Sequence, residues 1–177
     1  MFGAQDGELV PNMEETTDGA GLGLGTGGMC HFRKRSRVWE AEVVLKDVER
    51  DLRLAMSLRE DLAEVVSGLA EVARHVSLSG GALVHRSQLS QARTRREALT
   101  GRLKEAIEAV HAHGCVIKDL EVGLIDFPTL FEGREVYLCW KRGEDGIHFW
   151  HEVADGFRGR KPIDQEFLDN HRGDEPN

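Results

Sequence analysis

Apolar residues recur at intervals of three and four along the middle of the chain, beginning at residue 38. The run comprises Val38, Ala41, Leu45, Val48, Leu52, Ala55, Leu58, Leu62, Val65, Leu69, Val72 and Val76. This spacing matches the 3.6-residue period of an amphipathic α-helix, and it predicts one long helix over about residues 38–78. At 1.5 Å per residue, a helix of that length would extend about 60 Å. Gly68 is the point where we expect such a helix to bend or divide.

A second helical run follows the glycine-containing break SLSGGALV. Its apolar residues are Leu89, Ala92, Leu99, Leu103, Ala106 and Val110. Gly114 stands where a left-handed residue often ends a helix, so the pattern predicts a helix over about residues 86–113. The two helices would form an antiparallel hairpin. Because two helices alone leave part of such long apolar stripes uncovered, we expect a homodimer packed as a four-helix bundle.

After Gly114 the apolar period changes from about 3.6 to two. The segments CVIKDLEVGLIDFP, EVYLCWKR and GIHFWHE are short, and they are rich in β-branched and aromatic residues. They predict a three-stranded antiparallel β-meander over about residues 115–152, with a hairpin turn at residues 143–146. The predicted fold class is therefore α+β and mainly α: a long helical hairpin followed by a small meander.

Both ends of the chain differ in composition from this middle part. Residues 1–35 are first acidic, then glycine-rich and finally basic, which predicts a disordered extension. Residues 23–28 match the pattern G-x-G-x-x-G, but no strand precedes them and no helix follows, so they do not predict a dinucleotide site. Residues 164–177 are acidic and poor in apolar side chains, which predicts a flexible tail. Residues 36–163 are left as the folded domain.

Charge and cysteine usage narrow the function classes. The net charge of −8 argues against a general nucleic-acid-binding protein, which needs a basic face. The three cysteines, Cys30, Cys115 and Cys139, form no C-x-x-C pair, which is typical of thiols kept reduced. No apolar run is long enough to span a membrane, and no signal-peptide pattern is present. We therefore expect a cytoplasmic protein without a membrane segment.

A series of short motifs in residues 118–160 is similar to the pattern of a known family. They are KDL at 118–120, GL-x-DFP at 123–128, GREVYLCW at 133–140, GE at 143–144, WH at 150–151 and GF-x-GR at 156–160. This part of the chain closely resembles the bacterial DUF2203 family. The resemblance implies a long helical hairpin, described as ferritin-like, with a small β element. It implies no activity, and residues 1–35 have no counterpart in it.

A ferritin-like hairpin raises the question of a metal centre among the helices. Di-metal bundles use Glu-x-x-His pairs, because a spacing of three places both ligands on one helical face. Glu108 and His111 form such a pair, but the apolar stripe of the first helix carries no clear additional carboxylate. The nearby run His111, His113 and Cys115 lacks a second ligand pair for zinc. Histidines at a helix C-terminus also favour the negative end of the helix dipole.

The predicted sheet carries the denser set of polar residues. His151 would share a face with Ile147 and Phe149, so we expect it to be partly buried and paired with either Asp119 or Asp126. Such a pair would bind a divalent metal or act as acid and base, or it would fix the strand register as a hydrogen-bonded pair, with Arg160 clamping a carboxylate. The loop at residues 156–162 would bind an anion or lie on the surface. The candidate ligand-binding residues are Lys118, Asp119, Asp126, Glu135 and Arg160; the candidate metal ligands are His151, Asp119, Asp126, Glu108 and His111.

The sequence thus favours a non-enzymatic binding or assembly module that dimerises through its helices, with a small-molecule ligand that the sequence does not identify. The alternative is a metal-binding enzyme or redox protein, with a divalent metal as cofactor, that uses a site of histidine and carboxylate side chains in the C-terminal β region.

Overall fold

The computed structural model describes residues 35–78 and 86–174. All of them lie in one compact unit, His31–Asn177. The predicted disordered extension falls outside the described residues except for Arg35, and so does the glycine-rich motif at residues 23–28.

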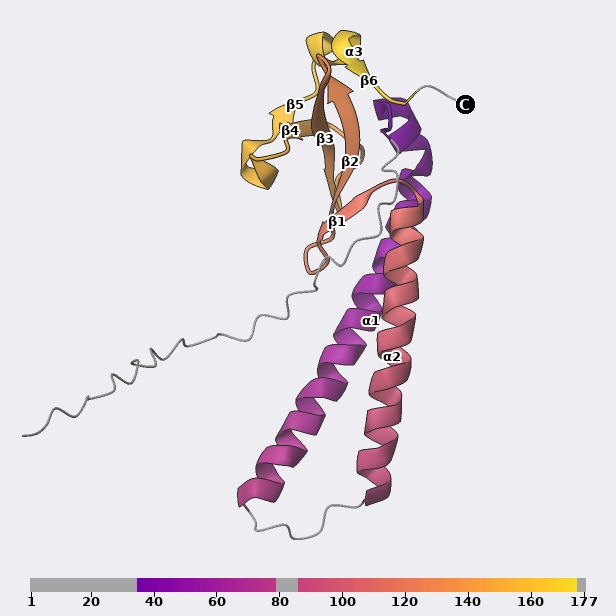
Figure 1. Ribbon diagram of the computed structural model, residues 1–177, viewed down its shortest axis with the longest axis vertical. Coiled ribbons are helices and arrows are strands. Elements are labelled where there is room, and N and C mark those ends of the chain that lie inside the picture. Colours follow the sequence, from indigo (N-terminus) through magenta and orange to yellow (C-terminus); the bar gives the residue numbers. More distant parts are fainter. Residues whose placement is uncertain (1–34, 79–85, 175–177) are drawn as a thin grey trace, which may run out of the picture. The chain divides into compact units, whose positions relative to one another are not determined.

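Two long helices form an antiparallel hairpin (Figure 1). Helix α1 spans Val38–Leu78 and helix α2 spans Arg86–Ala112, where the sequence predicted about 38–78 and 86–113. At the start of α1, the Glu40 side chain accepts a hydrogen bond of 2.7 Å from the backbone N–H of Arg37, as in half of a capping box. Gly114 follows α2 with a φ of 87°. Of the two outcomes expected at Gly68, a bend or a division, the division does not occur: α1 continues through this glycine as one helix, and nothing lies within 4 Å of the position where a Cβ would be.

The sheet has six strands among the described residues, twice the predicted number. Strands β1 to β5 follow one another in space, and β6 pairs antiparallel with β2. The strands are β1 (Val116–Asp119), β2 (Leu124–Phe131), β3 (Arg134–Lys141), β4 (Phe149–Glu152), β5 (Lys161–Pro162) and β6 (His171–Arg172).

The first predicted strand is in fact two strands, β1 and β2, joined by a tight turn. Asp119 Oδ1 accepts hydrogen bonds from the backbone N–H groups of Glu121 and Val122, at 2.8 and 3.2 Å. Gly123 completes the turn with a φ of 70°, a conformation that favours glycine. A side-chain-to-backbone turn of this kind interrupts a period-two pattern without changing its composition.

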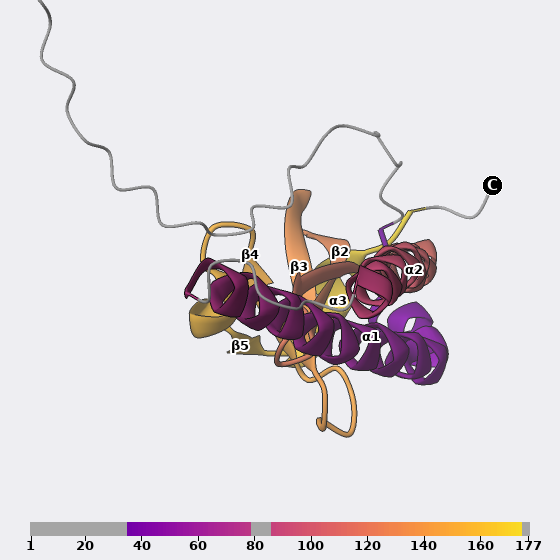
Figure 2. The same ribbon diagram turned by 90° about the horizontal axis from the view of Figure 1, so that it is seen from below.

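The N-terminal half of α1 covers one face of the sheet. Ala41, Leu45, Val48 and Leu52 belong to one buried cluster with sheet residues that include Ile125, Phe127, Leu138 and Trp140. A second, smaller cluster joins the two helices through Ala55, Leu58, Leu99 and Ala106. Figures 1 and 2 both show α1 and α2 side by side, and Figure 1 shows the far end of the hairpin extending past the strands. The core is thus concentrated at the sheet end of α1.

The C-terminal segment is folded, which corrects the prediction of a flexible tail from residue 164. Helix α3 spans Gln165–Asn170, and Asp164 caps it by accepting a 2.9 Å hydrogen bond from the backbone N–H of Phe167. Phe167 is 1% exposed and stacks on Phe131 and Trp150, with 4.9 Å between ring centroids in each case. The buried ring of Phe167 and the cap from Asp164 thus hold in place a C-terminal segment whose average composition is acidic and polar.

Candidate functional site on the sheet

Three buried polar side chains meet on the sheet face opposite α1. Asp126 lies on β2, Cys139 on β3 and His151 on β4, which are neighbouring strands. Asp126 is paired across the strands with Cys139, and His151 is paired with Tyr137, two residues from Cys139. Because side chains alternate between faces, Asp126 points away from the core side defined by Ile125 and Phe127.

This group is almost fully enclosed. Asp126 and His151 are each 1% exposed and Cys139 is 0% exposed. One ligand atom from each of the three residues lies within 4.8 Å of the others. Burial, followed by the Asp126 carboxylate, raises the pKa of the Cys139 thiol to about 12. The thiol is therefore protonated at neutral pH in this arrangement.

The histidine contacts define where its protons lie. Nδ1 of His151 is 2.7 Å from the backbone carbonyl oxygen of Glu152, and a carbonyl oxygen only accepts, so Nδ1 carries a hydrogen. Nε2 faces Asp126 Oδ2 at 3.1 Å. At 3.1 Å, Nε2 and Oδ2 would repel each other if each presented only a lone pair. A proton or another cation must therefore lie between Nε2 and Oδ2.

The carboxylate of Asp126 has a second neighbour and one unpaired oxygen. Lys118 Nζ is 3.7 Å from Asp126 Oδ2, and the lysine side chain is 37% exposed. The ammonium also lies 4.7 Å from the centroid of the Tyr137 ring, whose own distance to the His151 ring is 5.7 Å. Oδ1 of Asp126 is buried and has no hydrogen-bond partner among the described residues. The Cys139 thiol lies beside this carboxylate, and its hydrogen bond with Asp126 contributes to the raised pKa of the thiol.

A second group beside Cys139 holds the connection between β3 and β4. Arg160 donates to Glu144 Oε1 at 2.6 Å, and its guanidinium lies over the rings of Phe149 and Phe157, at 4.0 and 4.7 Å from their centroids. Glu144 Oε2 in turn accepts from the backbone N–H of Lys141 at 2.9 Å. The carboxylate that Arg160 clamps is therefore Glu144. The loop at residues 156–162 is folded into a short 3-10 helix, η1 (Gly156–Gly159), and strand β5.

The other candidates lie outside the group of Asp126, Cys139 and His151. Asp119 caps the turn between β1 and β2. Glu135 forms an ion pair of 3.7 Å with Arg35. Glu108 is exposed on α2, where it forms an ion pair of 3.8 Å with Lys104. His111 is exposed on the last turn of the same helix, so neither member of the Glu-x-x-His pair approaches the sheet cluster.

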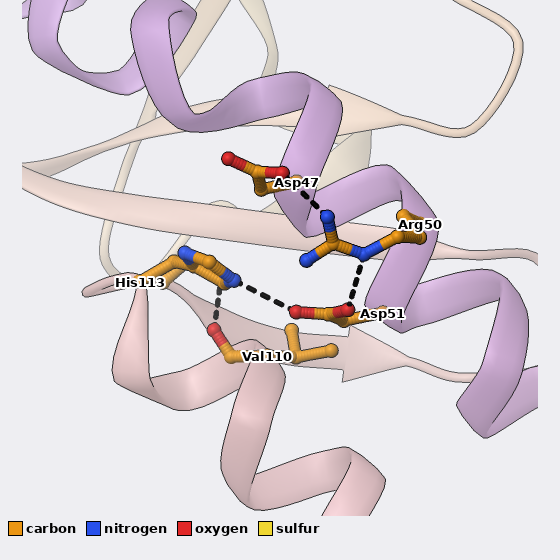
Figure 3. A network of polar contacts seen from close by, with 6 residues as sticks. Asp47, Arg50, Asp51, Val110 and His113 are labelled. Atoms are coloured by element: carbon orange, nitrogen blue, oxygen red, sulfur yellow. Dashed lines mark hydrogen bonds and ion pairs between the residues drawn. The ribbon is translucent and has the colours of Figure 1, made fainter.

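The histidine run at the end of α2 ties the two helices together (Figure 3). His113 Nε2 is 2.9 Å from Asp51 Oδ2 on α1, and Arg50 bridges Asp51 and Asp47 at 3.0 and 2.7 Å. The hydrogen bond from His113, followed by that from Arg50, lowers the pKa of Asp51. The nearby Cys115 thiol donates to the backbone carbonyl of Val110 at 3.2 Å. His113 and Cys115 thus each have a local structural partner.

Sequence reasoning missed Cys139 as a member of the site. The alternation of side chains along β3 puts Cys139 on one face with Tyr137, but the sequence does not show that this face meets Asp126. The missing signal is the register between β2 and β3, in which Asp126 is directly opposite Cys139.

These features define a small α+β protein in which a helical hairpin supports an antiparallel sheet with a buried polar cluster. A family model described as "Uncharacterized conserved protein (DUF2203)" matches residues 37–163. The chain belongs to the DUF2203 family, as its motifs suggested. No curated protein and no solved structure matches the chain significantly. Among the described residues, no helix is both long enough and apolar enough to cross a membrane.

Proposed function

We propose that this protein is a non-enzymatic assembly module in which the hairpin of one copy packs against the hairpin of a second copy. The observation that carries the proposal is the lack of cover over the far half of α1. Within the described helix, no residue after Leu58 is buried, although the apolar stripe continues for five more turns. Leu62, Val65, Leu69 and Val76 are only half-buried there.

A groove between the two helices supports the same proposal. It has a volume of about 450 Å³ and opens at the far half of the hairpin. Its apolar lining is Val65, Leu69, Val72, Leu89 and Ala92. Apolar side chains from a second hairpin would fill this groove and remove the stripe from water, which is the main driving force of most protein association.

The charges of the two helices favour a second copy as the occupant. The far half of α1 carries Glu60, Asp61, Glu64 and Glu71 against Arg59 and Arg74. The facing half of α2 carries Arg93, Arg95, Arg96 and Arg102 against Glu97. If α1 of one copy packs against α2 of the partner, helices of opposite charge meet. This arrangement is favoured over one in which α1 packs against α1 and like charges meet. Four helices packed in this way would form the ferritin-like bundle that the family resemblance implies.

The position of the polar cluster also fits a role without catalysis. Asp126, Cys139 and His151 are enclosed, and they line neither the helix groove nor the second pocket on the described surface. That second pocket lies between β4, β5 and α3 and includes Arg134, Lys161 and Glu166. The cluster is thus placed to hold the sheet together while the helices associate.

The proposal is tested by the mass of the protein in solution. Light scattering after size-exclusion chromatography at micromolar concentrations should give the mass of a dimer. Leu69→Glu, in the stripe, should give a monomer, because it places a charge in the apolar contact. Ala70→Glu introduces the same residue at the neighbouring exposed position and should remain a dimer. Circular dichroism would show that both variants keep their helices, and a wild-type protein that is monomeric at these concentrations would contradict the proposal.

A further inference from the structure

We propose that Asp126, Cys139 and His151 form a buried structural site for a zinc ion. The site is separate from the helix groove and does not depend on the assembly proposed above. Its three residues supply a carboxylate, a thiol and an imidazole from three adjacent strands, with ligand atoms within 4.8 Å of one another. An ion bound there would link β2, β3 and β4 through their side chains.

The geometry of the histidine suits a ligand. Structural and catalytic zinc sites commonly orient a ligating histidine through a hydrogen bond from its other ring nitrogen to a backbone carbonyl. His151 has this arrangement, because Nδ1 donates to the Glu152 carbonyl oxygen and Nε2 points at Asp126. The 3.1 Å between Nε2 and Oδ2 is close to the ligand separation of about 3.3 Å in a tetrahedral site with zinc bonds near 2.0 Å.

The unpaired oxygen of Asp126 is a further donor atom at the site. Buried carboxylate oxygens are ordinarily hydrogen-bonded, and Oδ1 has no such partner among the described residues. With Oδ2 bound beside His151, Oδ1 of the same carboxylate would also face the ion. Asp126, Cys139 and His151 thus supply three positions of a tetrahedral zinc site, and a small ligand such as water would take the fourth.

The charges of the site select the kind of ion. On binding, the ion would displace to solvent the proton of the Cys139 thiol and the proton held between His151 and Asp126. The resulting thiolate and carboxylate together balance a divalent cation, and the imidazole remains neutral. A neutral complex suits a site whose three residues are no more than 1% exposed. Sulfur and imidazole donors favour zinc over magnesium or calcium, which prefer oxygen ligands. Lys118 is the lysine beside Asp126, and its 37% exposed side chain reaches solvent.

Cobalt substitution provides the direct test, because a thiolate bound to Co²⁺ gives a charge-transfer absorption that a carboxylate or an imidazole does not. The protein would be purified without a metal-affinity tag, treated with a chelator and titrated with Co²⁺ and then Zn²⁺. We expect one Co²⁺ per chain with the charge-transfer band, and its displacement by one Zn²⁺. Zinc should also raise the thermal unfolding midpoint, because it binds the folded state.

Two cysteine variants locate the site. Cys139→Ala should lose the charge-transfer band and weaken zinc binding by about a hundredfold or more, because a direct ligand matters at least as much as an outer partner. Cys115→Ala removes the other described buried thiol, which donates to a backbone carbonyl, and should keep the band. Should Cys139→Ala not fold, Cys139→Ser keeps the shape of the side chain and carries the same expectation.

Three results would overturn the proposal. One is a wild-type protein without stoichiometric Co²⁺ or Zn²⁺ at micromolar concentrations, which would leave a proton alone between His151 and Asp126. Another is a charge-transfer band that persists in the Cys139 variant. The third is a band that disappears in Cys115→Ala instead. The oligomeric state of the same samples reports separately on the assembly proposal, so either proposal can fail without the other.

Discussion

Replacement of Phe167 by alanine tests whether the C-terminal segment belongs to the core. The ring is 1% exposed and stacks on Phe131, Trp150 and His171, at centroid distances of 4.9, 4.9 and 5.3 Å. Removal of a buried phenylalanine side chain costs about 3 to 5 kcal/mol, from lost burial and from the cavity that remains. Against a total stability of about 5 to 15 kcal/mol, that loss would be large.

The measurement is urea unfolding followed by circular dichroism. Phe167→Ala should shift the midpoint strongly to lower urea while leaving the slope nearly unchanged, because the variant still unfolds the same surface. Leu168→Ala is the matched control, since Leu168 is the next residue and is 42% exposed. It should change the unfolding free energy by no more than about 0.5 kcal/mol.

A shortened chain that ends at Ile163 extends the test. It would also remove the hydrogen bond from Thr129 Oγ1 to the Arg172 carbonyl, at 3.1 Å, and the contacts of Asp174 with Arg35. We expect it to be at least as unstable as Phe167→Ala. If both changes cost no more than about 0.5 kcal/mol, within the range of ordinary surface substitutions, the packing of α3 against the sheet is not what stabilises this part of the fold.

Two further predictions concern the helix tie and the glycines. Asp51→Asn should lower the unfolding free energy by about 1 kcal/mol at neutral pH, because it weakens the hydrogen bond between His113 and the partly exposed side chain of residue 51. The pKa of Asp51 is lowered in the folded state, so its contribution to the unfolding free energy should be complete above the ordinary aspartate pKa of about 4. That contribution should disappear as the pH falls through the lowered pKa, which urea unfolding at several pH values would show. Asp47→Asn changes an exposed carboxylate and is the control, since it should alter the unfolding free energy little. Gly123→Ala should destabilise by about 1 to 3 kcal/mol, because φ is 70° and the new Cβ would lie 2.8 Å from Arg142 Cβ. Gly101→Ala, in α2 with nothing within 4 Å, should instead stabilise by about 0.5 to 1 kcal/mol in the same urea assay, and a shift of the same sign in both glycine variants would contradict this reasoning.

The helices were predictable because their signal is repeated many times. A stripe of twelve apolar positions fixes the period of α1, and one misplaced residue such as Gly68 does not change it. The α+β class, mainly helical, is confirmed for the same reason. The strands β5 and β6 have only two residues each, which is too short for any period to appear. They exist because neighbouring segments place them beside β4 and β2.

The polar cluster was predictable only in part, because its members are distant in sequence. The alternation of β4 indicated that His151 is buried and needs a carboxylate, but it left Asp119 and Asp126 as equal partners. The structure brings Asp126 to His151 because the β2–β3 register sets Asp126 opposite Cys139 and the β3–β4 register sets His151 opposite Tyr137, whereas Asp119 begins the turn between β1 and β2. Asp119 is instead used by the backbone of that turn. Register depends on turn geometry, which composition does not encode.

The far half of the hairpin and the polar cluster are energetically separate features of one chain. The buried cluster that contains the sheet takes its α1 residues from the stretch Ala41–Met56, whereas Leu69 lies more than three helical turns beyond it. Substitutions without shared partners usually have additive effects. Leu69→Glu should therefore alter the oligomeric state without altering metal affinity, and Cys139→Ala should do the reverse. If the effects on oligomeric state and on metal affinity are not additive in the double variant, association of the helices is coupled to the sheet. Helix α1 would carry that coupling, since it contacts both regions.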